Sequence, residues 1–137
     1  MDMIPEINLG PLLLVIFSIT ALVVLIKWRL KKAEQRLVGN AVSFENGPQH
    51  SDGTLYYFYH PRCGPCRSMM PVIDDLISRY PERIIKVNVG ENRELTISMG
   101  IRATPTMLLV KDNKIFRAVI GAKSAKFLEK MLNANNS

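Results

Sequence analysis

The chain of 137 residues contains two cysteines, Cys63 and Cys66, in the sequence CGPC. Apolar residues recur at helical spacing after the pair and predict a helix over 63–80, directly behind a short aromatic strand over 55–59. Cys63 then lies where the helix begins, and Cys66 lies one turn further along on the same side. Two thiols placed in this way can form a disulfide without a change in the backbone, so the pair is a candidate redox couple.

The two cysteines have different expected roles. Unpaired N–H groups at the helix start, together with the cation of Arg62, favour the thiolate of Cys63 and make it the predicted nucleophile. Cys66 lies inside the first turn and should be less exposed, so it is the predicted resolving thiol that breaks a mixed disulfide. Gly64 lets the backbone of a partner approach closely, and Pro65 occupies an early helical position where no N–H is needed.

Three alternative roles for the cysteine pair stay open at this point. A structural disulfide would close a loop so short that it restrains little chain entropy. A zinc site needs about four ligands, and only His50 and His60 could join the two cysteines, so no metal is expected. The thiols could also be inert core residues, although a CxxC at a strand-to-helix junction favours redox chemistry.

The elements around the pair alternate between strands and helices. Pro71 should bend the first helix rather than end it, because the apolar periodicity resumes beyond it. Asp112-Asn113 predicts a hairpin turn between the last two strands. The predicted class is α/β, a sheet with helices on its faces. The remaining expected elements are strands over 83–89, 106–111 and 114–120 and helices over 92–100 and 124–134.

A second kind of segment precedes this domain. Residues 9–26, LGPLLLVIFSITALVVLI, carry no charge and would span about 27 Å as a helix, close to the thickness of a bilayer core. We therefore expect a single N-terminal transmembrane helix rather than a cleaved signal or a core helix. The predicted organisation is a leader (1–8), this helix (9–26), a basic helix and linker with a short strand at 42–44 (27–53), and the α/β domain (54–137).

Charge is unequal on the two sides of the apolar run. Asp2 and Glu6 precede it, whereas five basic residues and Glu34 follow it within ten residues. By the positive-inside rule the α/β domain faces the cytoplasm, with an outward-facing domain as the alternative. Trp28 suits the membrane interface. The five basic residues are Lys27, Arg29, Lys31, Lys32 and Arg36.

The net charge of +6 does not indicate nucleic-acid binding. The chain shows no basic stripe with interleaved aromatic residues and no recognised nucleic-acid-binding motif. The excess of basic residues is read as solvated surface, and no nucleic-acid partner is expected.

The motifs of the α/β domain resemble those of the thioredoxin family over about 54–134. The resemblance rests on CGPC followed by Pro71, on GIRATPT over 100–106, and on Gly121 after the last strand. It implies a thioredoxin-like fold with a truncated N-terminal part and a cis peptide bond at Thr104-Pro105. Pro105 would stand beside the first cysteine, and a groove would receive the partner's chain. The groove residues implied are Arg62, Gly64, Pro65, Ala103, Thr104, Pro105 and Gly121.

Several positions depart from the family's pattern. Arg62 and Tyr59 replace the two tryptophans usual around the motif, and Tyr57 replaces a buried acidic residue. Lys86 corresponds to the usual lysine partner of that acid. His60, three residues before the first cysteine, could tune its thiolate near neutral pH. Tyr57, His60 and Lys86 are therefore the expected tuning residues.

Together these features predict a membrane-anchored enzyme that reduces protein disulfides by thiol–disulfide exchange at Cys63 and Cys66. No bound cofactor is implied. The expected partners are disulfide-containing proteins, a reductase or membrane electron donor, and the membrane through residues 9–26. The alternatives are an outward-facing redox relay and a thioredoxin-fold binding module in which catalysis is incidental.

Overall fold

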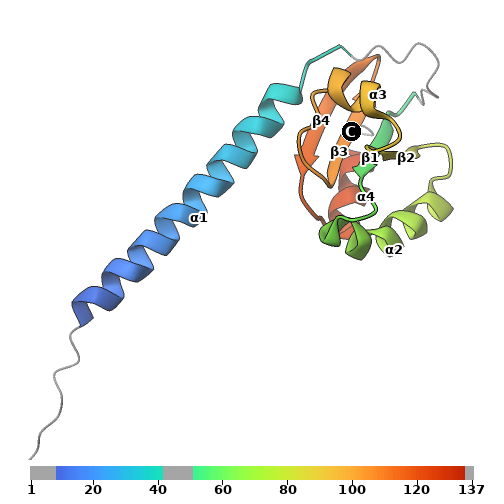
Figure 1. Ribbon diagram of the computed structural model, residues 1–137. Coiled ribbons are helices and arrows are strands. Elements are labelled where there is room, and N and C mark those ends of the chain that lie inside the picture. Colours follow the sequence, from blue (N-terminus) through green and yellow to red (C-terminus); the bar gives the residue numbers. More distant parts are fainter. Residues whose placement is uncertain (1–8, 42–50, 135–137) are drawn as a thin grey trace, which may run out of the picture. The chain divides into compact units, whose positions relative to one another are not determined.

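The computed structural model describes residues 9–41 and 51–134. The chain forms two compact units, Met1–Ala33 and Glu34–Ser137. The first holds most of helix α1, and the second holds the α/β domain (Figure 1). The predicted strand at 42–44 lies outside the described residues.

Helix α1 (Leu9–Leu37) is continuous through the apolar run and the basic segment that follows. Its apolar side chains over residues 10–30 are exposed, with Phe17 73% exposed and Leu14 71% exposed. Lys32 Nζ lies 4.9 Å from the centre of the Trp28 ring. The helix is long and apolar enough to cross a membrane, although a signal sequence or a buried core helix would meet the same criteria of length and composition.

The domain is built on a mixed sheet with the strand order β2-β1-β3-β4. Strand β1 (Thr54–Tyr59) pairs in parallel with β2 (Ile84–Asn88) and antiparallel with β3 (Thr106–Lys111), which pairs antiparallel with β4 (Lys114–Ile120). Asp112 and Asn113 have φ values of 49° and 57° and form the predicted hairpin turn. The parallel pair requires a crossover, and helix α2 (Gly64–Arg79) provides it.

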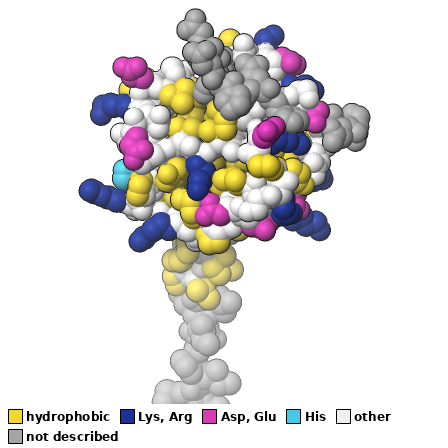
Figure 2. Space-filling view, turned by 90° about the vertical axis from the view of Figure 1, so that its right-hand side faces the viewer, with side chains coloured by type: hydrophobic (Ala, Val, Ile, Leu, Met, Phe, Trp, Pro, Cys, Tyr) yellow, Lys and Arg dark blue, Asp and Glu magenta, His cyan; other side chains and the backbone are white. Residues whose placement is uncertain are grey.

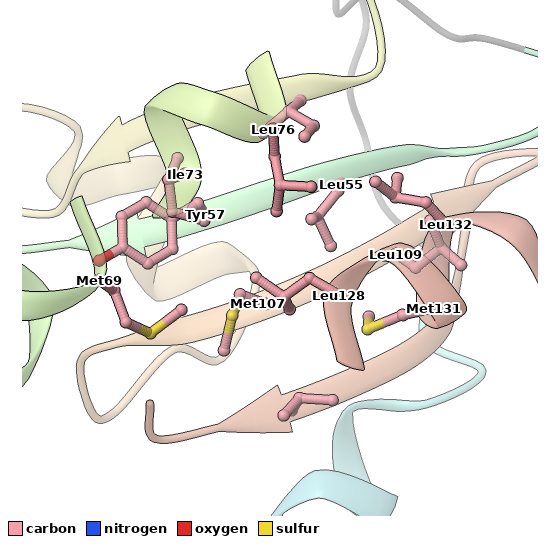
Figure 3. Packing of buried hydrophobic residues seen from close by; sticks show 12 residues of the cluster. Leu55, Tyr57, Met69, Ile73, Leu76, Met107, Leu109, Leu128, Met131 and Leu132 are labelled. Atoms are coloured by element: carbon pink, nitrogen blue, oxygen red, sulfur yellow. The ribbon is translucent and has the colours of Figure 1, made fainter. Parts of the chain in front are cut away.

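Helices cover both faces of the sheet, as the α/β prediction requires (Figure 1). Successive strand residues point to opposite faces, so Leu55 and Tyr57 join one core while Tyr56 and Phe58 join the other. The first core lies against α2 (Gly64–Arg79) and α4 (Ala125–Asn133), whose buried residues meet those of β1 and β3 (Figure 3). The second core lies against α3 (Arg93–Ser98).

The last turn of α1 belongs to the domain. Leu37 is buried in the second core, and Glu34 Oε1 accepts a hydrogen bond of 2.9 Å from the backbone N–H of Ile120. The chain then forms a bridge between Ala41 and Lys114 at the outer edge of β4. This short segment covers part of an edge strand that would otherwise expose unpaired backbone groups.

The helices begin close to their predicted starts, and capping residues account for the small differences. Cys63 is the N-cap of α2, so the helix proper begins at Gly64, and it continues through Pro71 as predicted. Ser124 caps α4 by accepting a hydrogen bond from the N–H of Phe127. Helix α3 lies inside the predicted range 92–100, with Asn92 and Met99 as its caps, and Gly100 follows it with a φ of 69°.

Candidate active site

Cys63 and Cys66 form a disulfide at the N-terminus of α2. Cys63 has extended backbone angles as the N-cap, and its Sγ lies 3.3 Å from the backbone nitrogen of Cys66. Cys66 is fully buried, whereas Cys63 is half-buried and Gly64 and Pro65 beside it are exposed. Only the first sulfur is therefore open to another molecule.

This position favours a thiolate on Cys63 once the disulfide is reduced. A side chain at the N-cap faces N–H groups that the helix leaves unpaired, and here the N–H of Cys66 is directed at the sulfur. A Cβ atom added to Gly64 would meet no atom of the chain within 4 Å, so the space above this residue is open. An incoming peptide can approach the sulfur from that side.

Two loops from distant parts of the sequence meet beside the disulfide. Cys63 Sγ lies 3.5 Å from the carbonyl oxygen of Thr104, and the Thr104-Pro105 bond is cis, as the resemblance implies. The N–H of Gly121 donates a hydrogen bond of 2.8 Å to the carbonyl oxygen of Pro105. Gly121 has a φ of 87°, which a residue with a Cβ rarely adopts. Pro105 is buried, while Arg62 and Ala103 are exposed and Thr104 is half-buried at the surface.

Tyr57 connects the sheet to the helix that carries the cysteines. Its ring is buried in the first core (Figure 3), and its hydroxyl donates a hydrogen bond of 3.1 Å to the carbonyl oxygen of Cys66. Burial raises the pKa of Tyr57 to about 12, with smaller contributions from Tyr59 and Asp74. Tyr57 and Tyr59 stack with ring centres 5.7 Å apart. The hydroxyl is therefore a donor at neutral pH and not a base.

Lys86 lies on β2 opposite Tyr57 in the parallel register, but its amine turns to α2. Lys86 Nζ lies 2.9 Å from Asp74 Oδ1, and both side chains are partly exposed. Sequence reasoning missed Asp74, since a single aspartate on the polar side of a helix resembles any solvated residue. Its link to Lys86 becomes visible only when α2 is packed against the sheet.

His60 is held by the loop that precedes Cys63. Its Nδ1 accepts a hydrogen bond of 3.1 Å from the backbone N–H of Arg62, and its carbonyl oxygen accepts one of 3.0 Å from the N–H of Cys63. The ring is thereby oriented through the backbone of the loop. Within residues 9–41 and 51–134, no three His, Cys, Asp or Glu side chains gather into a group that could hold a metal ion.

Comparison with known proteins agrees with this geometry. A sequence model of the family Thioredoxin matches residues 36–134. Thioredoxin from Haemophilus influenzae is 33% identical over 97 residues, which are 69% of this chain and 91% of that protein. Thioredoxin 1 from Synechococcus elongatus is 39% identical over 70 residues, which are 50% of this chain and 65% of that protein.

Solved structures give the same result for the fold. The crystal structure of mitochondrial thioredoxin 3 from Saccharomyces cerevisiae, in its oxidised form, is 34% identical with a TM-score of 0.58 and covers 66% of this chain and 86% of that one. Thioredoxin NaTrxh from Nicotiana alata is 32% identical with a TM-score of 0.60 and covers 67% of this chain and 80% of that one. The predicted thioredoxin-like α/β fold is thus confirmed.

The family match begins at residue 36, so the apolar run of α1 lies outside it. From that point the match extends through the CxxC pair, the cis-proline loop and the last helix to residue 134. The chain therefore belongs to the thioredoxin family, and its Cys63–Cys66 pair makes it a thiol–disulfide oxidoreductase.

Proposed function

We propose that the chain is a membrane-anchored reductase of protein disulfides. Residues 9–26 form the anchor, residues 27–53 connect it to the catalytic domain, and residues 54–137 carry out the exchange. The main observation behind the proposal is the unequal exposure of the two sulfurs at the start of α2. The sulfur of Cys63 is accessible to a substrate, whereas that of Cys66 is buried.

The reaction begins with the reduced pair. The thiolate of Cys63 attacks one sulfur of a substrate disulfide, forms a mixed disulfide and releases the other substrate sulfur as a thiolate. Cys66 then loses its proton and attacks the Sγ of Cys63, so that the substrate leaves with both of its cysteines reduced. Two electrons have passed to the substrate, and the chain holds the Cys63–Cys66 disulfide.

The exposed surface around Cys63 receives the extended chain of the substrate. The backbone beside the cis-proline lies next to the sulfur, and Gly121 leaves room where a larger residue would project. Arg62 adds a cation next to the nucleophile. The residues proposed for this groove are Arg62, Gly64, Pro65, Ala103, Thr104, Pro105 and Gly121.

A partner must reduce the Cys63–Cys66 disulfide again before another turnover. If the domain faces the cytoplasm, as the basic residues after α1's apolar run favour, this partner is a thioredoxin reductase acting on the same exposed sulfur. A domain on the outer side would instead take electrons from a membrane carrier. The exposed apolar side chains of α1 support the anchor, because a lipid core would cover them.

Cysteine variants of the full chain in detergent test the proposed roles. With dithiothreitol as electron donor, the wild type should reduce insulin disulfides, and Cys63→Ser should abolish this activity. Cys66→Ser should retain the attack and accumulate a mixed disulfide with the substrate, visible on a non-reducing gel. Equal trapping by both variants, or faster alkylation of Cys66 than of Cys63, would contradict the assignment of roles.

A further inference from the structure

A pocket of about 280 Å³ opens beside the disulfide, where it shares Ala103 and Thr104 with the proposed groove and extends beyond them. It lies between the loop before Cys63, the end of the α3 region and the segment before the cis-proline. Its walls come from strands and loops that are far apart in the sequence. The lining residues are His60, Val89, Thr96, Ile101, Arg102, Ala103 and Thr104.

The pocket is connected directly to the reacting sulfur. Thr104 lines it, and the carbonyl oxygen of the same residue lies 3.5 Å from Cys63 Sγ. His60 lines it from the other side, and its carbonyl oxygen binds the N–H of Cys63. Because an extended chain advances about 3.3–3.6 Å per residue, side chains within three residues of a substrate cysteine can reach this pocket.

Two side chains, Arg102 and His60, supply hydrogen-bond donors to the pocket. Arg102 is exposed and always charged, and its guanidinium makes no ion pair with the residues that the structure describes. His60 accepts a hydrogen bond at Nδ1, which requires a lone pair there, so the proton of the neutral ring lies on Nε2. The hydroxyl of Thr96 already donates to the carbonyl oxygen of Asn92.

No carboxylate is among the seven lining residues. The nearby Glu91 and Glu94 line a separate pocket, and Glu91 also accepts a hydrogen bond of 2.7 Å from the side chain of Asn88. Val89, Ile101 and Ala103 provide apolar walls. The pocket therefore offers a cation and an N–H donor above an apolar surface, which complements a short aliphatic stem that ends in a carboxylate.

We propose that this pocket receives a glutamate or aspartate side chain of the substrate protein, within three residues of the cysteine that Cys63 attacks. The inference rests on the proposed reductase function and names the class of substrate that the site prefers. Arg102 binds the carboxylate, and His60 donates a second hydrogen bond from Nε2. The preference acts while the mixed disulfide forms, because the substrate chain then lies along the cis-proline loop.

Disulfide-linked peptides that differ at one residue test the proposal with the full chain in detergent. Each position from three residues before to three residues after the cysteine is occupied in turn by Glu, Gln or Lys. At one or more positions kcat/KM for Glu should exceed that for Gln by about fivefold to tenfold, the effect of one partly exposed charge-assisted contact. Lys at the same position should be poorer than Gln.

The ratio of kcat/KM for Glu to that for Gln is then measured in three variants, two of which each lose one cation. Arg102→Gln should bring the ratio close to 1, and Arg102→Lys should keep part of it. Arg67→Gln is the matched control, because Arg67 is an exposed cation one turn from Cys63 that does not line the pocket. This variant should keep the wild-type ratio, since a general field effect of positive charge is screened by salt.

A ratio near 1 at every position in the wild type would overturn the proposal, and so would an unchanged ratio in Arg102→Gln. If Arg67→Gln lowers the Glu-to-Gln ratio as much as Arg102→Gln does, the preference comes from a diffuse positive field and not from the pocket. If neutral peptides are reduced without any preference, only the pocket inference fails. If the wild type reduces none of the peptides, the reductase function itself fails.

Discussion

The hydroxyl of Tyr57 binds the backbone of Cys66, at a position where the thioredoxin family usually has a buried carboxylate. Cys66 must lose its proton before it can attack the mixed disulfide. A phenol whose pKa is raised to about 12 cannot accept that proton at neutral pH. Tyr57 instead stabilises the first turn of α2, and the proton leaves through water or another base.

Resolution by Cys66 should therefore be slower here than attack by Cys63, and Tyr57→Asp should accelerate it. The introduced carboxylate would lie near Cys66 and could accept its proton. Single-turnover kinetics of mixed-disulfide decay measure the step directly, and we expect an increase of about tenfold or more.

Tyr57→Phe is the matched control for this experiment. It removes the hydroxyl without supplying a base, so its mixed disulfide should decay at the wild-type rate. If Tyr57→Asp folds, as shown by its near-UV circular dichroism, and yet decays no faster than Tyr57→Phe, the absence of a base at this position does not limit the reaction.

The same tyrosine predicts a loss of stability in alkali. Its pKa is about 12 in the folded chain and about 10 in an unfolded chain, so the unfolded state releases the proton first as the pH rises. The stabilising contribution is complete below pH 10 and is lost as the pH approaches 12. Between pH 9 and 12 the wild type should lose about 1–3 kcal/mol more of its free energy of unfolding than Tyr57→Phe. Urea unfolding at several pH values measures this, and equal losses would contradict it.

The entry to β1 and the end of α4 depend on a residue that no sequence pattern singled out. Arg83 is only 8% exposed, and its guanidinium donates to the carbonyl oxygens of Asp52, Gly53 and Leu132. The last of these bonds is 2.8 Å long and satisfies a carbonyl in the final turn of α4, where a cation also suits the helix dipole. One side chain thus joins the entry to β1 with the end of α4.

Arg83→Ala should lower the free energy of unfolding by about 2–4 kcal/mol, because it leaves buried carbonyl groups without donors. Arg83→Lys should recover only part of the loss, since a single ammonium cannot replace a planar group with several donors. Urea titration followed by the near-UV signal of the buried tyrosines measures both. Arg79→Ala is the control: its ion pairs with Asp75 and Glu129 lie in solvent, so its effect should be much smaller. A loss in Arg83→Ala no greater than in this control would contradict the role.

If α1 anchors the whole molecule in a membrane as proposed, the unequal charge on the two sides of its apolar run bears on which side the domain faces. On the face shown in Figure 2, basic and acidic side chains of the domain are interspersed, without one large basic patch. The cluster of basic residues after the apolar run is therefore the charge feature most relevant to orientation.

Reporter fusions at the C-terminus should place the domain in the cytoplasm. A fluorescent protein that matures only inside should be bright, and alkaline phosphatase, which is active only outside, should be silent. Replacing the five basic residues of 27–36 by glutamine and adding lysines within 1–8 should reverse the two signals. Strong phosphatase activity in the unaltered chain would show the outward orientation.

Local sequence patterns were sufficient to predict most of the secondary structure of the α/β domain and its redox pair. Apolar periodicity predicted the helices and strands described over residues 54–134 to within a few residues, because that pattern is set by which side of each element faces a core. The two cysteines at the start of a helix predicted the redox pair. The cis bond at Pro105 followed from resemblance alone, since a proline before a strand is ordinarily trans.

Contacts between segments that are distant in the sequence could be identified only in the tertiary structure. Lys86 corresponds to the lysine that in the family partners a buried acid, and only the packing of α2 against the sheet shows that its amine contacts Asp74 here. Arg83 was predicted only as the first residue of a strand, and the folded chain buries it where three carbonyl groups converge on its guanidinium. Leu37 and Glu34 lie in the segment predicted as a basic helix and linker, yet Leu37 is buried in the second core and Glu34 binds the backbone of Ile120. No local pattern encodes such contacts, since each depends on where two elements meet after the whole domain has packed.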